Sequence, residues 1–272
     1  MNTSNKRGMP FLEHIEVLRR HLIHGLFGVV VGAFVLMLNK EILFDYVIFA
    51  PARADFFTYR LFNIIGEWLG QPDLLILPQD LQIQNRKLFG QFNTYIWSCV
   101  FWGGILASPY VFYELWKFIK PALSIEERRC SQGIIIVASL LFFSGVLFGY
   151  FVLFPMAIQF GYGFTISSLP QNIFDLSDYI SMITQSVLTM GITFLFPLLA
   201  YFLAKSGLIT PEFLSTYRKH AFLVLLIIAA AITPSDILST AIAVLPLLFL
   251  YELSVYVVAL VYKRERYMRE RG

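Results

Sequence analysis

Uncharged and charged positions alternate along this chain in long blocks. Six apolar runs, the last interrupted only by Glu252, are separated by segments that hold almost all of the charge. An apolar run of about 18 residues or more is long enough to cross a bilayer as a helix. The pattern therefore predicts six transmembrane helices, over approximately residues 22–39, 88–115, 131–154, 179–204, 219–233 and 237–261.

The third apolar run is longer than one membrane span requires. The third uncharged run continues to Leu176, but its second half contains Pro155 and Pro170, which are typical of a loop. We expect one helix that ends near Phe154, followed by a loop.

The fifth run, Ala221–Ile232, would cover about 18 Å as a helix, less than the roughly 30 Å of a bilayer core. We expect the last two helices to be short spans; a hairpin that dips into the membrane and returns is the alternative.

The distribution of Lys and Arg predicts the orientation of the chain. Sixteen of the 21 Lys and Arg residues fall in the N-tail, the C-tail and the connections after the second and fourth spans. The other five lie in the long segment 40–87. Because Lys and Arg are enriched in cytoplasmic segments, we predict that both termini are cytoplasmic and that 40–87 is a long first outer loop.

The composition agrees with a membrane protein and excludes several other classes. The chain is 57% hydrophobic and 14% charged, too apolar for a soluble domain of 272 residues. Two cysteines give no disulfide framework, and the four histidines lack the spacing of a metal site. The first 21 residues do not resemble a cleavable signal peptide. We therefore predict an all-α integral membrane protein, a single domain over residues 1–272, without metal, cofactor or nucleic-acid partner.

An acidic and basic cluster, "PALSIEERRC" (121–130), stands between the second and third spans. Pro121 would end the preceding helix, because proline lacks an N–H and restricts the residue before it. Ser124 and Glu127 have the spacing of a capping box for the next helix. The same carboxylates, Glu126 and Glu127, could instead accept a bidentate guanidinium from another chain. The residues alone leave both interpretations open.

A second acidic segment, "FLEHIEVLRRHL", leads into the first span. It predicts an amphipathic helix at the membrane surface whose apolar face consists of Phe11, Ile15, Leu18 and Leu22. Glu13 and Glu16 lie on another side of this helix. Glu16 could pair internally with Arg19 or Arg20, or it could face a partner.

Two further acids lie among apolar residues. Glu252 would cost about 2.5–3.5 kcal/mol as an ion at the middle of a bilayer, so we expect it to face other helices, protonated or paired. We expect Asp236, in "TPSD", to cap the last helix from the outer surface.

A secondary transporter of a small solute is the alternative function, with a midplane site formed by Glu252, Gln185 and Thr189. No repeat supports it, and no G-x-S-x-G sequence indicates a hydrolase.

Five segments follow one another along the chain: "FLEHIEVLRR", "ASPYVFYELWKFIKPALSIEERR", "LFFSGVLFGYFVLFP", "GLITPEFLSTYRKHAFLVLLIIAAAITPSD" and "AVLPLLFLYELSVY". Together they resemble the TatC family, the six-helix subunits of the twin-arginine (Tat) protein translocase. The resemblance implies a signal-peptide receptor and scaffold, not an enzyme, that exports folded proteins across the bacterial cytoplasmic (inner) membrane using the proton motive force. It also implies single-span TatA/TatB-like partners and a homo-oligomer in the receptor complex.

The resemblance assigns roles to individual residues. Glu127 matches the carboxylate that docks the paired arginines of a signal peptide, and Phe118 and Pro121 match its neighbours. Pro51 matches a proline of the first outer loop, and Asp236 an acid of the last outer turn.

The chain departs from the family pattern at two acidic positions. Val17 stands where the family has an N-terminal glutamate, so Glu16 or Glu13 would substitute. Leu195 stands where the family often has a polar residue in the fourth span. The weaker candidates for contact with partner helices are Gln185, Thr189 and Thr193.

Overall fold

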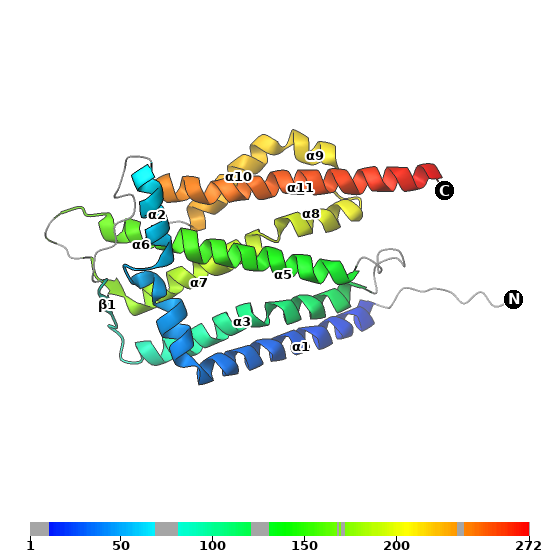
Figure 1. Ribbon diagram of the computed structural model, residues 1–272. Helices are drawn as coiled ribbons and strands as arrows, with labels where there is room; N and C mark the ends of the chain where they lie inside the picture. The colour runs from blue at the N-terminus through cyan, green and yellow to red at the C-terminus, as the bar shows by residue number, and fades with distance from the viewer. Residues whose placement is uncertain are drawn as a thin grey trace. The chain divides into compact units, whose positions relative to one another are not determined.

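The computed structural model describes residues 11–68, 81–120, 131–167, 169, 172–232 and 237–271, and these are mostly helical (Figure 1). The helices are α1 (Phe11–Leu38), η1 (Ile42–Ile48), η2 (Ala50–Ala52), α2 (Phe57–Trp68), α3 (Gly90–Ile119), α5 (Ser131–Phe148), η4 (Gly149–Leu153), α6 (Phe154–Gly163), α7 (Leu176–Thr193), α8 (Phe196–Lys205), α9 (Pro211–Thr216), α10 (Arg218–Ile232) and α11 (Ile237–Arg271). Two short strands, β1 (Ile83–Gln84) and β2 (Phe174–Asp175), pair in parallel, with Ile83 opposite Phe174.

Contacts within the chain divide it into two compact units, which are described separately. Unit 1 consists of Met1–Lys40 and Tyr95–Leu140; it contains α1, most of α3 and the first part of α5. Unit 2 consists of Glu41–Thr94 and Leu141–Gly272 and contains the remaining elements. This division does not test the single domain predicted over residues 1–272, which stays a prediction.

In unit 1, α1 and α3 run antiparallel and their backbones touch. A Cβ atom on Gly32 would lie 2.6 Å from the carbonyl oxygen of Gly103, closer than real Cβ atoms approach. Glycine at both positions therefore permits the close packing that small residues give membrane helices. Towards the C-terminal end of α1, the Tyr95 hydroxyl donates to the carbonyl of Met37 at 2.8 Å.

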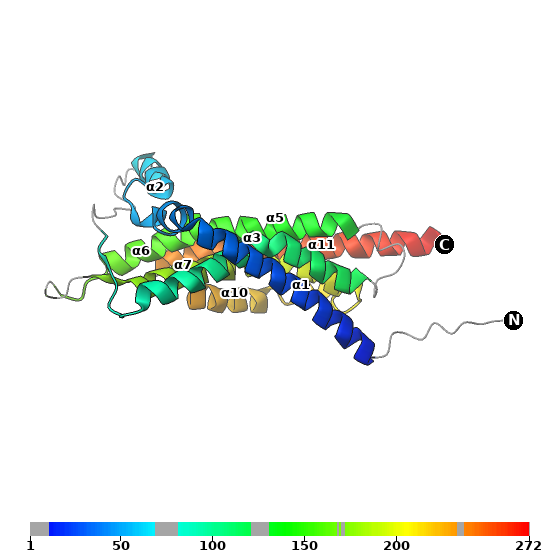
Figure 2. The ribbon, with the colours of Figure 1, turned by 90° about the horizontal axis from the view of Figure 1, so that it is seen from below.

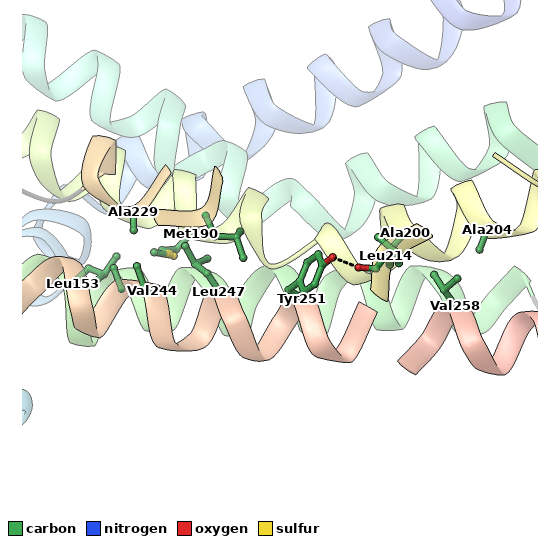
Figure 3. Packing of buried hydrophobic residues seen from close by; sticks show 12 residues of the cluster. Leu153, Met190, Ala200, Ala204, Leu214, Ala229, Val244, Leu247, Tyr251 and Val258 are labelled. Carbon is green, nitrogen blue, oxygen red and sulfur yellow. Dashed lines mark hydrogen bonds between the residues drawn. The ribbon is translucent and has the colours of Figure 1, made fainter. Parts of the chain in front are cut away.

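In unit 2, the last helices pack around an apolar cluster (Figure 3). Its buried members are Leu153, Met190, Ala200, Ala204, Leu214, Leu225, Ala229, Ala243, Val244, Leu247, Tyr251 and Val258. α11 contributes five of them and packs along α8 and α10. The Tyr251 hydroxyl donates to the carbonyl of Leu214 at 2.6 Å, so the one polar atom that Tyr251 brings into the cluster is satisfied.

The third predicted span does not end near Phe154, and the loop expected there is wrong. α5 passes through the π-helical turn η4 directly into α6, which ends at Gly163. Pro155 stands at the start of α6, where its fixed φ suits a helix. A π-helical turn absorbs the local change in hydrogen bonding, so the proline does not stop the chain.

The fourth predicted span is a broken helix. α7 begins where Asp175 accepts a hydrogen bond from the backbone N–H of Ser177 at 2.9 Å. This bond holds the pKa of Asp175 below its usual value. α7 ends at Thr193, and α8 follows with Pro197 in its first turn. Proline at that position allows a new helix to start but not the old one to continue.

The prediction of a mostly helical membrane protein is confirmed in this coarse form. Among the described residues, five helical segments are long and apolar enough to span a bilayer: Ile15–Leu38, Gly90–Ile119, Gly133–Gly163, Leu176–Lys205 and Ala243–Lys263. The fifth predicted span, α10, has 15 residues and falls short of that length, so the count of six spans stays a prediction. The expectation that the last helix is also short is wrong, because α11 has 35 residues and includes Pro246 without a break.

Candidate functional site

One end of unit 1 gathers charged side chains from α1 and α3. His21 Nδ1 lies 2.7 Å from one carboxylate oxygen of Glu114, and Lys117 Nζ lies 3.2 Å from the other. Only 5% of Glu114 is exposed. A buried carboxylate is costly unless it is paired and hydrogen-bonded, and here both oxygens have a partner.

Sequence reasoning missed Glu114, because its partner His21 lies 93 residues away. A local signal was present. Glu114 is the first charged residue after the second apolar run, and Lys117 follows it one helical turn later. The ammonium group of Lys117 also lies 4.3 Å from the ring centroid of Tyr113, so the aromatic ring and the carboxylate hold the same cation.

The acidic segment of α1 belongs to the same continuous helix as the first span. Glu16 is exposed and Val17 is half-buried. Within the described part of the chain, Glu16 forms no ion pair with Arg19 or Arg20, so the internal pairing considered from the sequence is not formed. Glu13 lies in α1, and its side chain is outside what the structure describes.

The other predicted docking residues lie at and after the end of α3. Phe118 is half-buried in the last turn of that helix, one turn after Glu114. Pro121, Glu126 and Glu127 lie outside the described residues. The structure therefore brings Phe118 and the bridge from His21 to Glu114 to one end of the pair formed by α1 and α3.

In unit 2, Pro51 is buried in η2, and its role is visible in its carbonyl. The Tyr59 hydroxyl donates to the Pro51 carbonyl oxygen at 2.8 Å, and burial raises the pKa of the Tyr59 phenol above its usual value. The fixed φ of proline suits the tight 3₁₀ turn, and its missing N–H is not required there.

Two more tyrosines hold the segment just before Pro51. The hydroxyl of Tyr150 donates to the carbonyl of Val47 at 2.6 Å, and that of Tyr179 to the carbonyl of Ile48 at 2.9 Å. These carbonyls end η1, where a helix leaves its last acceptors without intrahelical partners. Three phenols therefore satisfy acceptors along residues 47–51, one from eight residues away in the sequence and two from 103 and 131 residues away.

Glu252 lies at the surface of unit 2 and is paired with a residue of another helix. It is 55% exposed as a side chain and pairs with Arg218, 51% exposed, at 3.0 Å. Glu252 stands 15 residues after the start of α11 at Ile237, about 22 Å along the helix, and Arg218 is the first residue of α10. The pair thus joins α11 to the beginning of α10, so the expectation that Glu252 faces another helix and is paired is confirmed, and its depth in the bilayer stays a prediction. Asp236 lies outside the described residues.

The three polar candidates of the fourth span follow one another along α7. Gln185 is exposed, whereas Thr189 and Thr193 are half-buried. The Thr193 hydroxyl donates to the carbonyl of Thr189 at 2.7 Å, so it is satisfied within its own helix. In the described part of the chain, Glu252 bonds to neither Gln185 nor Thr189, and the polar site of a solute transporter is not assembled.

Comparison with known proteins decides the family. The family model described as "Sec-independent protein translocase protein (TatC)" matches residues 13–246. The chain belongs to the TatC family. A relative from Blattabacterium sp. subsp. Periplaneta americana, named Sec-independent protein translocase protein TatC, is 55% identical over 264 residues, which cover 96% of this chain and 99% of the relative. A TatC protein of Halalkalibacterium halodurans is 31% identical and covers 98% of this chain and 100% of its own length.

A solved structure gives the same result for the fold. The structure titled "Crystal Structure of Twin Arginine Translocase Receptor- TatC" matches with a TM-score of 0.68 and 28% identity, over 91% of this chain and 98% of that chain. The resemblance stated from the sequence motifs is confirmed. This TatC-family chain is therefore a membrane component of a protein translocase, and membership gives it a transport role rather than an enzymatic one.

Proposed function

We propose that this chain is the signal-peptide receptor and scaffold of the twin-arginine translocase, and that it exports folded proteins across the cytoplasmic membrane using the proton motive force. The observation that carries the proposal is the family match over residues 13–246, together with the charged end of unit 1. The related structure is titled a twin-arginine translocase receptor, which supports the same role here.

The recognition chemistry in this proposal is carboxylate to guanidinium. Glu127 and Glu126 accept the paired arginines, and Glu16 or Glu13 supplies further acidic groups from α1. Phe118 and Pro121 shape the surface beside them. An arginine side chain binds a carboxylate through two parallel N–H donors, which lysine cannot do, and the pair is strengthened near the low-dielectric membrane surface.

The bridge from Glu114 to His21 and Lys117 supports this arrangement. It ties the part of α1 that carries Glu16 to the last turns of α3, which carry Phe118. Because Glu114 is buried and both of its oxygens are occupied, we assign it to positioning these two helices rather than to binding arginine.

The remaining parts of the proposal concern orientation and partners. Both termini and the docking surface face the cytoplasm, following the distribution of Lys and Arg. The single-span TatA/TatB-like subunits pack against α7 along Gln185, Thr189 and Thr193, since an exposed amide on a spanning helix favours a polar partner. The chain forms a homo-oligomer in the receptor complex, and Pro51 and Asp236 maintain the outer segments.

Site-specific crosslinking tests the docking surface. A photoreactive residue at position 16, 118 or 127 should crosslink to a twin-arginine peptide several-fold more strongly than to a twin-lysine peptide. A photoreactive residue at position 67, in α2 of unit 2, is the control and should show no preference. Equal yields for the two peptides at all four positions would contradict the receptor role.

Substitution of Glu127 tests the leading carboxylate. We expect Glu127→Ala to abolish export of a twin-arginine reporter and Glu127→Gln to retain little, because a neutral amide cannot form the charged bidentate pair. Glu212→Ala, at an exposed acid at the start of α9, is the matched control and should export normally. Normal export by both Glu127 variants, at normal protein level, would leave Glu127 as a helix cap only.

A further inference from the structure

The helix α2 carries an exposed apolar stripe, although the segment 40–87 was expected only to be an outer loop. Phe57, Leu61, Ile64 and Trp68 are 64%, 42%, 64% and 87% exposed. Their spacing of four, three and four places them on one face of the helix, within a sector of about 60° at 100° per residue. A soluble loop helix would present its polar residues at these positions.

The other sides of α2 differ sharply from this stripe. Tyr59 and Gly66 are buried and lie on the opposite side, about 180° away. Arg60 and Glu67 are exposed and share a third side, between the other two. The helix therefore has one side against the protein, an apolar side pointing away from it, and a charged edge between them.

Contacts within unit 2 fix this orientation. The Thr58 hydroxyl donates to the carbonyl of Phe151 in η4 at 2.7 Å, and the ring of Phe56, just before α2, stacks on that of Phe151 with centroids 5.6 Å apart. Together with the bond from Tyr59 to Pro51, these contacts hold the buried side of α2 in place. The apolar stripe is thus directed outwards by the fold, and the partly exposed ring of Phe57 at its start also meets that of Phe151 edge to face, with centroids 6.3 Å apart.

The direction of α2 also differs from that of the spanning helices of its unit. Figures 1 and 2 show α2 running across the direction of α7 and α11, beside the end of the unit where α11 begins. A helix placed in this way at the ends of membrane spans lies parallel to the membrane plane. The neighbouring η1 continues the apolar surface, with Ile42 and Tyr46 exposed four residues apart.

We propose that α2 is an interfacial helix that lies in the membrane–water boundary, with Phe57, Leu61, Ile64 and Trp68 inserted among the lipids. The apolar stripe faces the acyl and headgroup boundary, and Arg60 and Glu67 face water. Aromatic residues at both ends of the stripe fit this location, because Trp and other amphipathic rings concentrate at membrane interfaces. The helix holds residues 47–59 at a fixed depth in the bilayer.

Spin labels measure this depth directly. The full chain, with Cys130→Ser, is reconstituted in vesicles of phosphatidylethanolamine and phosphatidylglycerol, with one label at a time introduced through Leu61→Cys, Ile64→Cys, Arg60→Cys or Glu67→Cys. Buried Cys99 is not accessible to the labelling reagent in the folded protein. At positions 61 and 64, we expect collisions with lipid-soluble oxygen to exceed collisions with a water-soluble nickel chelate several-fold. Positions 60 and 67 should show the reverse.

Two results would overturn the proposal. Labels at positions 61 and 64 that meet the nickel chelate as often as those at 60 and 67 would place the stripe in water. Labels shielded from both reagents would show that protein covers the stripe, and their exposure on dilution with lipid would identify a second copy of the chain. This experiment uses no signal peptide, so its outcome is independent of the receptor function proposed above.

Discussion

The two units hold their helices together with different chemistry. In unit 1, the contacts between α1 and α3 include a glycine-to-glycine backbone contact, a tyrosine hydroxyl and a hydrogen bond from His21 to the buried carboxylate of Glu114, which Lys117 of α3 also pairs with. Unit 2 has a broad apolar cluster, tyrosine hydroxyls on main-chain carbonyls, and an ion pair that is more than half exposed.

The two ion pairs show how burial changes the contribution of a carboxylate and its cation to stability. Glu114 and Glu252 each meet a cation within 3.2 Å. Around Glu114 the protein excludes solvent, so removal of the carboxylate leaves partners that were arranged for it. Glu252 and Arg218 lie at the surface of the protein, where such pairs contribute little. We therefore expect the charged bridge to dominate the α1–α3 contact, and the apolar cluster to dominate unit 2.

The largest effect is expected for Glu114→Ala. Loss of two hydrogen bonds to a buried charged group should lower the free energy of unfolding by about 2–3 kcal/mol. In a Cys130→Ser background, the thiol of buried Cys99 reports unfolding of α3 through its reaction with a fluorogenic maleimide during heating.

Glu114→Gln keeps the shape and an acceptor for His21, so its unfolding temperature should fall less than that of Glu114→Ala. An unchanged midpoint for both variants would show that the bridge contributes nothing to unit 1.

A smaller effect is expected for Tyr59→Phe in unit 2. The substitution leaves the buried carbonyl of Pro51 without its donor, at a cost of about 1–2 kcal/mol. Thermal loss of the monodisperse peak in detergent measures the change. Tyr46→Phe removes an exposed hydroxyl of η1 and is the control, which should match the parent protein. An equal decrease in thermal stability for both variants would show that the hydrogen bond to Pro51 is not the cause.

The smallest effect is expected for Glu252→Ala. Pairs with both side chains about half exposed contribute less than about 1 kcal/mol, and salt screens them. The difference in thermal midpoint between the variant and the parent should be small and should shrink further in high salt. A loss as large as that of Glu114→Ala, insensitive to salt, would show that lipid surrounds this pair in the membrane.

Much of the helical framework could be predicted from the sequence, because apolar runs of membrane length have few alternatives to a helix. The fifth predicted span, 219–233, and α10 agree within one residue at each end. Errors arose where a local signal was read without its surroundings. Pro155 looked like a helix end, but η4 accommodates it, and α11 continues after its apolar part because charged residues with good helix propensity follow.

The candidate site was less predictable. Glu114 is hydrogen-bonded to His21, and the carbonyl of Pro51 is hydrogen-bonded to Tyr59. The sequence does not show which side chains form these bonds, because the partners come together only in the folded chain. For Glu252 the sequence predicted a paired acid that faces another helix, but its partner Arg218, 34 residues earlier, became known only from the fold. The roles assigned to Glu127, Glu126, Pro121 and Asp236 stay predictions.

Three main-chain carbonyls of the segment 47–51, those of Val47, Ile48 and Pro51, accept hydrogen bonds from phenols that belong to three other stretches of sequence. In a chimera that takes residues 47–51 from a relative, the backbone of the segment would come from that relative, whereas the hydrogen-bond donors Tyr59, Tyr150 and Tyr179 would come from the recipient protein. Exchange of the segment between relatives should therefore succeed only when the recipient presents hydroxyl groups at all three places. The conformation of this segment therefore depends on a scattered set of residues, and not on a contiguous loop alone.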